Sequence, residues 1–234
     1  GKVKFCKFND VSHLKKLVNK KTIAIIIEFI QGDGGINICS KTFAKAIKDI
    51  CKNKKILLIG DEIQGGIGRT GKIFAYKHYG VNPDIITSAK GLGSGIPIGA
   101  TIVKKYISKI ISAGFHGSTF GGGMLQTRVS YNVMKSINTK AFLNKVQING
   151  KILSNLLKKM HTEHKDKIVD TRCLGLMAGI EFKTNEIASK TYSKMAKNGL
   201  ITTLIQGNII RITPPLIINK KELNNGLNII SKSL

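Results

Sequence analysis

The chain has 234 residues, 42% of them hydrophobic, which is enough for one large domain or two small ones with a real core. No apolar run reaches the roughly 18 residues that a membrane helix needs, and no basic-then-apolar targeting segment opens the chain. We therefore predict a cytoplasmic protein without a membrane partner. Because the chain begins at Gly1 with no initiator Met, we also expect it to be a fragment.

The formal charge of +25 suggests nucleic-acid binding, but the distribution of the charge argues against it. Of the 38 basic residues four are arginine, and the lysines are scattered along the whole chain. Proteins that bind nucleic acids rely on the planar fork of arginine and gather their charge on one face. We predict no nucleic-acid partner and attribute the lysines to compositional drift in an AT-rich genome.

The cysteines and histidines give no metal-binding pattern. Four cysteines are present without a CxxC pair, which favours a reduced, cytoplasmic-type protein. His161 and His164 have helical spacing but no partner ligands nearby in sequence, so we expect them at the surface. The sequence predicts no metal site.

The first part of the chain alternates strand and helix. The apolar, β-branched run over residues 21–28 predicts a strand that ends at Glu28, followed by a glycine-rich loop. Apolar positions recur at helical spacing over residues 40–53, with Ser40 as a plausible N-cap. A second apolar run ends at Asp61, which completes a βαβ unit.

The same alternation continues up to about residue 120. The expected elements are a glycine-rich loop at 65–71, a short helix at 74–79, a strand at 84–87, a loop at 91–99 and a strand at 100–103. This order is typical of an α/β fold with a mostly parallel sheet. We predict that this sheet domain, with its connecting helix, covers residues 1–137.

A different pattern follows. We expect helices at 124–137, 140–160, 188–198 and 221–233, and strands at 168–170, 176–182 and 209–212. These elements fit a small α+β domain over residues 138–234, with the first helix as the connector.

Asp61 and Lys90 are the first candidates for chemistry. They lie 29 positions apart, each after a predicted strand, so both side chains are expected at the C-terminal edge of one parallel sheet. A structural salt bridge is the simplest interpretation of such a pair. Pyridoxal 5'-phosphate offers a second one, because it needs a lysine amine for a Schiff base and an acid at its pyridine nitrogen. Ser118 and Thr119, ahead of a long helix, could hold its phosphate.

Five motifs, taken together, resemble the class III aminotransferases of PLP fold type I. They occur in the order and spacing of that family: Glu28-x-Ile30-Gln31-Gly32-Asp33-Gly34-Gly35, Asp61-Glu62-Ile63-Gln64-x-Gly66-x-Gly68-Arg69-Thr70-Gly71, Ser88-Ala89-Lys90-Gly91-Leu92, His116-Gly117-Ser118-Thr119-Phe120-Gly121-Gly122 and Arg211-x-x-Pro214-Pro215-Leu216. Within the class, residues 75–84 are most similar to the acetylornithine/succinyldiaminopimelate group.

The resemblance implies roles for the residues that match. Lys90 would bond to the cofactor and then act as general acid/base, Asp61 would pair with the pyridine nitrogen, and Gln64 would hydrogen-bond the phenolic oxygen. Thr119, with Ser118, would reach the phosphate of the neighbouring subunit's cofactor, which implies a homodimer with a shared active site.

Substrate binding is implied in the same way. Arg211 would bind a substrate carboxylate bidentately, and Asp33 stands where the family has a glutamate that swings aside for the dicarboxylate substrate. Arg69, in a motif loop, is expected to serve structure. The family implies transfer of an amino group from N-acetylornithine or N-succinyl-diaminopimelate to 2-oxoglutarate.

Departures from the family pattern leave alternatives open. Besides Asp33, they are Phe29, Gly65 and the pair Gly123-Met124. In the family, the part before Gly1 carries the first phosphate-binding loop and much of the dimer interface. The alternatives are another class III ω-aminotransferase that uses ornithine or 4-aminobutyrate, and a non-catalytic remnant or basic binding module.

Overall fold

The computed structural model describes residues 2–234, which form two compact units. The first unit contains the chain up to Phe29 together with Cys39–Ile67 and Phe74–Lys135. The second contains Ile30–Ile38, Gly68–Ile73 and Ser136–Leu234. The predicted domain boundary after residue 137 stays a prediction.

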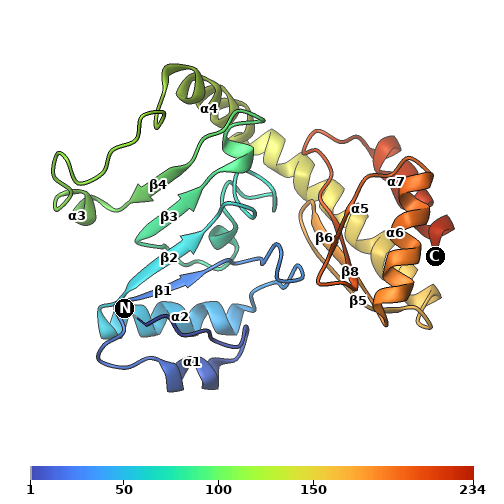
Figure 1. Cartoon of the computed structure of the whole chain (residues 1–234), viewed down its shortest axis with the longest axis horizontal. Coiled ribbons are helices and arrows are strands. Elements are labelled where there is room, and N and C mark those ends of the chain that lie inside the picture. Colours follow the sequence, from blue (N-terminus) through green and yellow to red (C-terminus); the bar gives the residue numbers. More distant parts are fainter. Residues whose placement is uncertain (1) are drawn as a thin grey trace. The chain divides into compact units, whose positions relative to one another are not determined.

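The first unit is built on a sheet in the order β1-β2-β3-β4 (Figure 1). Its strands are β1 (Ala24–Ile27), β2 (Leu57–Asp61), β3 (Ile85–Ser88) and β4 (Ala100–Val103). The first three strands are parallel, and β4 pairs antiparallel with β3. The prediction of a mostly parallel sheet is confirmed, although the direction of β4 was not predicted.

Helix α2 (Lys41–Lys54) is the crossover between β1 and β2, as the sequence predicts. The Ser40 side chain accepts a hydrogen bond from the Phe43 amide at 3.1 Å, so the predicted N-cap is confirmed. Phe43 and Ile47 are buried on the inner face of the helix. The other helical segments of this part are α1 (Val11–Leu17), η1 (Ala75–His78), η2 (Lys90–Leu92), α3 (Lys105–Ser108) and α4 (Met124–Ile137). Helices α1 and α3 are short and were not predicted.

One face of β1 is left uncovered by residues 2–234. Ile26 in this strand is 63% exposed, and Ala24 on the same face is half-buried, whereas Ile27 on the opposite face is buried. Parallel strands are normally buried on both faces because helices cover each side of the sheet. The described part of the chain therefore supplies cover for only one side of β1.

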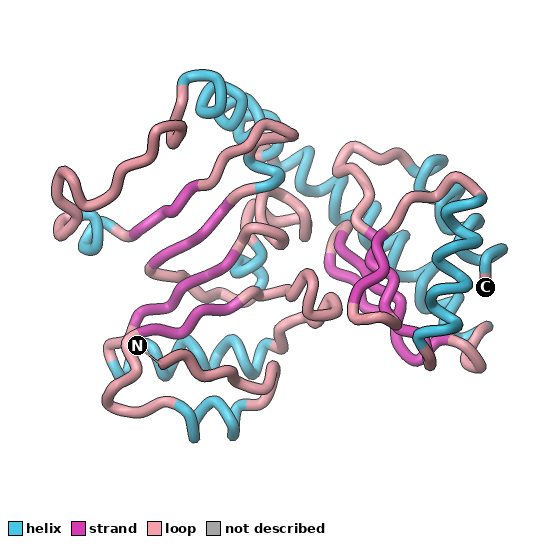
Figure 2. Tube along the Cα trace, viewed as in Figure 1, coloured by secondary structure: helices cyan, strands magenta, loops and turns pink. Residues whose placement is uncertain are grey.

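The second unit is an antiparallel sheet in the order β5-β6-β8-β7 with three helices (Figures 1 and 2). The strands are β5 (Ile168–Leu174), β6 (Met177–Phe182), β7 (Thr203–Ile205) and β8 (Ile209–Ile212), and the helices are α5 (Lys140–Glu163), α6 (Asn185–Lys197) and α7 (Lys220–Ser233). This is the α+β arrangement that the sequence predicts, with β7 as an additional strand.

Alternate residues of β6 face opposite sides of this sheet. Ala178, Ile180 and Phe182 are fully buried in one cluster with Leu153 of α5 and Leu227 of α7. This cluster is the core of the unit. The intervening residues of β6 therefore face away from the helices.

Helix α5 approaches the turn between β5 and β6 closely at Gly150. A Cβ atom at this position would lie 2.5 Å from the carbonyl oxygen of Gly175, so a glycine is required here despite its cost inside a helix. All four cysteines, which lie within the described residues, are free. Within residues 2–234 no helix is long and apolar enough to cross a membrane, and no cluster of potential metal ligands occurs.

Candidate active site

Asp61 is the last residue of β2, beside the adjacent parallel strand β3. One of its carboxylate oxygens, Oδ1, accepts hydrogen bonds from the Ile63 amide at 3.0 Å and from Thr87 Oγ1 at 3.1 Å. Thr87 reaches it because the two residues lie opposite each other in the register of the strands. No described residue donates a hydrogen bond to the second oxygen, Oδ2. The carboxylate is thus held in one orientation with an acceptor still available.

Lys90 lies two residues beyond the end of β3, at the same C-terminal edge of the sheet as Asp61. Its φ is +46°, in the left-handed region that non-glycine residues seldom adopt and that is often found at functional sites. The turn that follows is tight, because a Cβ atom on Gly93 would lie 1.9 Å from the Ile96 carbonyl oxygen.

The Lys90 amine takes part in no hydrogen bond or ion pair with the described residues. In particular, no ion pair joins it to Asp61, so the simple salt-bridge interpretation finds no support. A lysine amine and an available carboxylate oxygen at one sheet edge are the two groups that pyridoxal phosphate requires. The residues present fit this cofactor.

The other predicted cofactor contacts lie in irregular segments of the same unit. Gln64 is in the turn that follows β2, and Ser118 and Thr119 are exposed in the segment that precedes α4. The roles assigned to these residues stay predictions.

Glu62, next to Asp61, is a structural residue that sequence reasoning did not single out. Its carboxylate is fully buried and accepts hydrogen bonds from the amides of Ala75, at 2.7 Å, and Tyr76, at 2.8 Å. It therefore ties the end of β2 to η1. Burial raises the pKa of Glu62 to about 7, although the two amide donors act in the opposite direction. An acid directly after a buried strand was the only signal for it in the sequence.

The raised pKa of Glu62 predicts a pH-dependent stability. The folded state binds the proton more tightly than the unfolded state does, so this stabilising contribution is complete below about pH 4.5 and is lost as the pH rises through about 7. We expect Glu62→Gln to remove this dependence. The difference in unfolding free energy between wild type and variant should then change by at most about 3 kcal/mol over this range. Urea denaturation from pH 4.5 to 7.5 measures it, and parallel pH profiles would contradict the assignment.

The second unit contains the predicted pair of Arg211 and Asp33. Arg211 lies in β8, and its Nη1 atom donates a hydrogen bond to Asp33 Oδ1 at 2.6 Å. The Arg211 side chain is 18% exposed, whereas that of Asp33 is 74% exposed. An arginine that pairs with an exposed carboxylate is suited to exchange that carboxylate for the carboxylate of a substrate. The structure thus brings together two residues that are distant in sequence.

Arg69 is structural, as the sequence analysis expects. Its Nη1 atom donates hydrogen bonds to the carbonyl oxygens of Leu176, at 3.2 Å, and Pro214, at 2.6 Å. Burial lowers the pKa of Arg69 to about 10. Arg69 thereby fixes the segment that follows β8.

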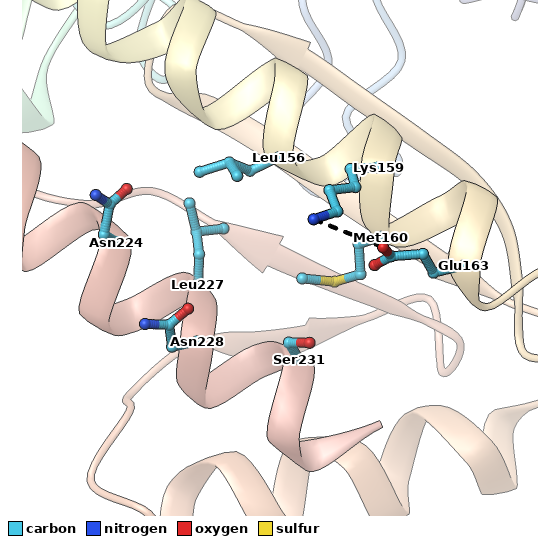
Figure 3. A pocket seen from close by; sticks show the side chains of 8 residues that line it. All are labelled: Leu156, Lys159, Met160, Glu163, Asn224, Leu227, Asn228 and Ser231. Atoms are coloured by element: carbon cyan, nitrogen blue, oxygen red, sulfur yellow. Dashed lines mark ion pairs between the residues drawn. The ribbon is translucent and has the colours of Figure 1, made fainter.

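A crevice on the second unit lies between α5 and α7 (Figure 3). Its apolar part is formed by Leu156, Met160 and Leu227. Beside them lies an exposed ion pair, in which Lys159 Nζ is 3.7 Å from Glu163 Oε1. None of the predicted site residues lines this crevice.

Three comparisons with known proteins agree with this fold. The chain is 40% identical to the acetylornithine aminotransferase of Methanocaldococcus jannaschii, over 98% of this chain and 57% of that protein. It is 38% identical to the acetylornithine/succinyldiaminopimelate aminotransferase of Buchnera aphidicola, over 97% of this chain and 56% of the relative. The solved ornithine aminotransferase of Plasmodium yoelii is 34% identical and superposes with a TM-score of 0.90, over 97% of this chain and 60% of that one.

The chain therefore shares the fold of the matching portion of solved aminotransferases. The family model for aminotransferase class-III matches residues 2–234. The chain belongs to the class-III aminotransferase family, and it spans less than two thirds of the length of these relatives.

Proposed function

We propose that the protein is a pyridoxal phosphate-dependent aminotransferase that converts N-acetylornithine, and N-succinyl-diaminopimelate, with 2-oxoglutarate as amino acceptor. This reaction belongs to arginine and lysine biosynthesis. The observation that carries the proposal is the site of Asp61 and Lys90. An oriented carboxylate with one available oxygen and an uncommitted amine lie at the same sheet edge, in a chain of a family that depends on this cofactor.

When bound, pyridoxal phosphate supplies an electron sink for the carbon that loses or gains the amino group. Asp61 would hold the protonated pyridine nitrogen, and its Oδ2 is available for this because Thr87 and the Ile63 amide bind the carboxylate by Oδ1. Lys90 would provide the amine that attaches the cofactor and would then serve as the general acid/base for the proton at the reacting carbon. Gln64, in the turn after β2, would donate a hydrogen bond to the phenolic oxygen of the ring.

Arg211 is the proposed carboxylate-binding residue. Its guanidinium can form two parallel hydrogen bonds with a carboxylate, which the point charge of a lysine cannot do. Asp33 binds the Arg211 guanidinium when the substrate offers no carboxylate at this position, since the two side chains pair directly. The exposure of Asp33 supports its release when a dicarboxylate arrives.

A homodimer with a shared site is proposed from the segment around Ser118 and Thr119. Phe115 is 74% exposed, Phe120 is 83% exposed and Met124 is 91% exposed. Such a run of apolar side chains beside the two hydroxyl residues is suited to contact with a second subunit. We further propose a cytoplasmic location, with neither nucleic acid nor membrane as a partner.

Steady-state kinetics with the full-length protein and added pyridoxal phosphate tests the substrate assignment. The amino donors to compare are N-acetylornithine, N-succinyl-diaminopimelate, ornithine and 4-aminobutyrate, each with 2-oxoglutarate. We expect the highest kcat/KM with N-acetylornithine. A preference for ornithine would favour the function named for the Plasmodium yoelii structure, and a preference for 4-aminobutyrate would equally reject our first choice. Absence of turnover together with absence of cofactor binding would indicate a non-catalytic remnant.

A further inference from the structure

Arg172 and Arg211 lie in one row across the sheet of the second unit. Arg172 of β5 is opposite Gly179 of β6, and Gly179 is in turn opposite Arg211 of β8. Residues directly opposite one another project to the same face of a sheet. The two arginines therefore share the face that points away from the core helices, and the residue between them has no side chain.

The loop of residues 30–38 fills the gap at Gly179. A Cβ atom on this glycine would lie 3.0 Å from Cγ1 of Ile36, which is fully buried. Ile36 has a φ of +57°, an unusual value for a β-branched residue, and so the loop is held there by its surroundings. The loop carries Asp33, the partner of Arg211.

Internal hydrogen bonds close the loop. The Gln31 amide donates to the Asn37 carbonyl oxygen at 2.9 Å, and an isolated β-bridge joins Ile30 to Ile38. The Asn37 side chain donates from Nδ2 to Gln31 Oε1 at 2.9 Å and to the Gly34 carbonyl oxygen at 2.7 Å. The loop is thus one connected body, and whatever holds Asn37 also places Asp33.

Arg172 fixes this loop to the sheet. Its Nη1 atom donates to the Gly35 carbonyl oxygen and to Asn37 Oδ1, the latter at 2.9 Å. Its other donors pair with Asp170, through Nε at 2.8 Å, and with Glu181. Two carboxylates on the strands therefore anchor the guanidinium, which is 18% exposed, while Nη1 holds the loop.

We infer that Arg172 is a positioning residue for carboxylate recognition. It holds the loop of residues 30–38 so that Asp33 faces Arg211, and it thereby sets how strongly Asp33 competes with a substrate carboxylate for Arg211. This inference rests on the proposed role of Arg211. A loop held at Gly35 and Asn37 lets the exposed Asp33 side chain exchange with a substrate without displacement of the backbone.

Hydrogen–deuterium exchange of the full-length protein tests the placement of the loop. We expect Arg172→Lys, which keeps the charge but not the fork of donors, to raise exchange in residues 30–38 by about fivefold, as loss of about 1 kcal/mol implies. Asn37→Ala, which leaves Arg172 intact, should also raise exchange in this loop. Lys190→Met, which removes an exposed ion pair on α6, is the control. Unchanged exchange of this loop in both loop variants would overturn the inference.

Calorimetric titration with glutarate, a five-carbon dicarboxylate, tests the link to recognition. Asp33→Asn removes the competitor and should lower the Kd by about two- to fivefold, the range expected for an ion pair with one exposed partner. Arg172→Lys should also lower the Kd, because the loosened loop no longer holds Asp33 against Arg211. The double variant should bind no tighter than Asp33→Asn alone, because Arg172 acts through Asp33.

Additive effects, or weaker glutarate binding by Arg172→Lys alone, would mean that Arg172 serves only general stability. Absence of glutarate binding in all of these proteins would reject the role of Arg211 and the inference with it. The proposed cofactor site would not be affected by that result, since pyridoxal phosphate binding is measured separately by absorbance.

Discussion

Replacing Lys90 with alanine abolishes the absorbance band of lysine-bound pyridoxal phosphate in the full-length protein and lowers kcat by at least about 10⁴-fold. Both effects follow from one side chain, because its amine provides the covalent attachment and the proton transfer. The uncommitted state of this amine and its place beside the Asp61 strand support the expectation. Absorbance titration with the cofactor and single-turnover kinetics measure the two effects.

Lys104→Ala is the matched control for this prediction. Lys104 belongs to the same unit, but its amine pairs with Asp84 at 2.7 Å and also donates to the Asn82 carbonyl oxygen. Its loss should reduce stability by about 1 kcal/mol or less and leave the absorbance band in place. If Lys90→Ala retained the band, or if Lys104→Ala lost it, the assignment of Lys90 would be wrong.

Arg211→Lys raises the KM for 2-oxoglutarate and lowers kcat/KM for it by about 10- to 100-fold. The expected loss corresponds to about 1.5–3 kcal/mol, the contribution of a hydrogen bond to a charged group, because lysine cannot bind a carboxylate with two parallel donors. Binding of the cofactor should be unchanged, since Arg211 belongs to the second unit and Asp61 and Lys90 belong to the first.

Arg128→Lys controls for the loss of a guanidinium as such. Arg128 is exposed on α4, where it lies over the ring of Tyr131 at 5.7 Å, and it has no proposed part in catalysis. Kinetics with varied 2-oxoglutarate compares the two variants. An unchanged KM in Arg211→Lys would contradict the assignment of the carboxylate-binding residue.

Several features of the first unit could be predicted from the sequence because their signals are local. The N-cap at Ser40 and the helical spacing that follows it specify α2 without reference to the rest of the chain. The apolar runs that end at Asp61 and just before Lys90 predict two strands, and the short crossover between them favours a parallel pair. Their shared place at one sheet edge follows from this topology.

Other features depend on contacts that no local pattern encodes. Glu62 is buried because η1 packs over its carboxylate and donates two hydrogen bonds to it. The same Asp-Glu pair at an exposed strand end would leave the glutamate in water. The short strand β7 and the helix α1 have too few residues for a periodic signal. β4 runs antiparallel to β3 because the loop between them turns the chain back along the same sheet edge. The apolar run of β4 predicts a strand but not its direction.

The sequence by itself determined the fold class, the family pattern and the placement of Asp61 and Lys90, because strand ends and spacing act over short distances. Only the tertiary structure decided that the loop of residues 30–38 lies on the sheet of the second unit. It also decided that Arg172 holds this loop and that Asp33 pairs with Arg211. These contacts join segments more than a hundred residues apart, and folding alone brings such segments together.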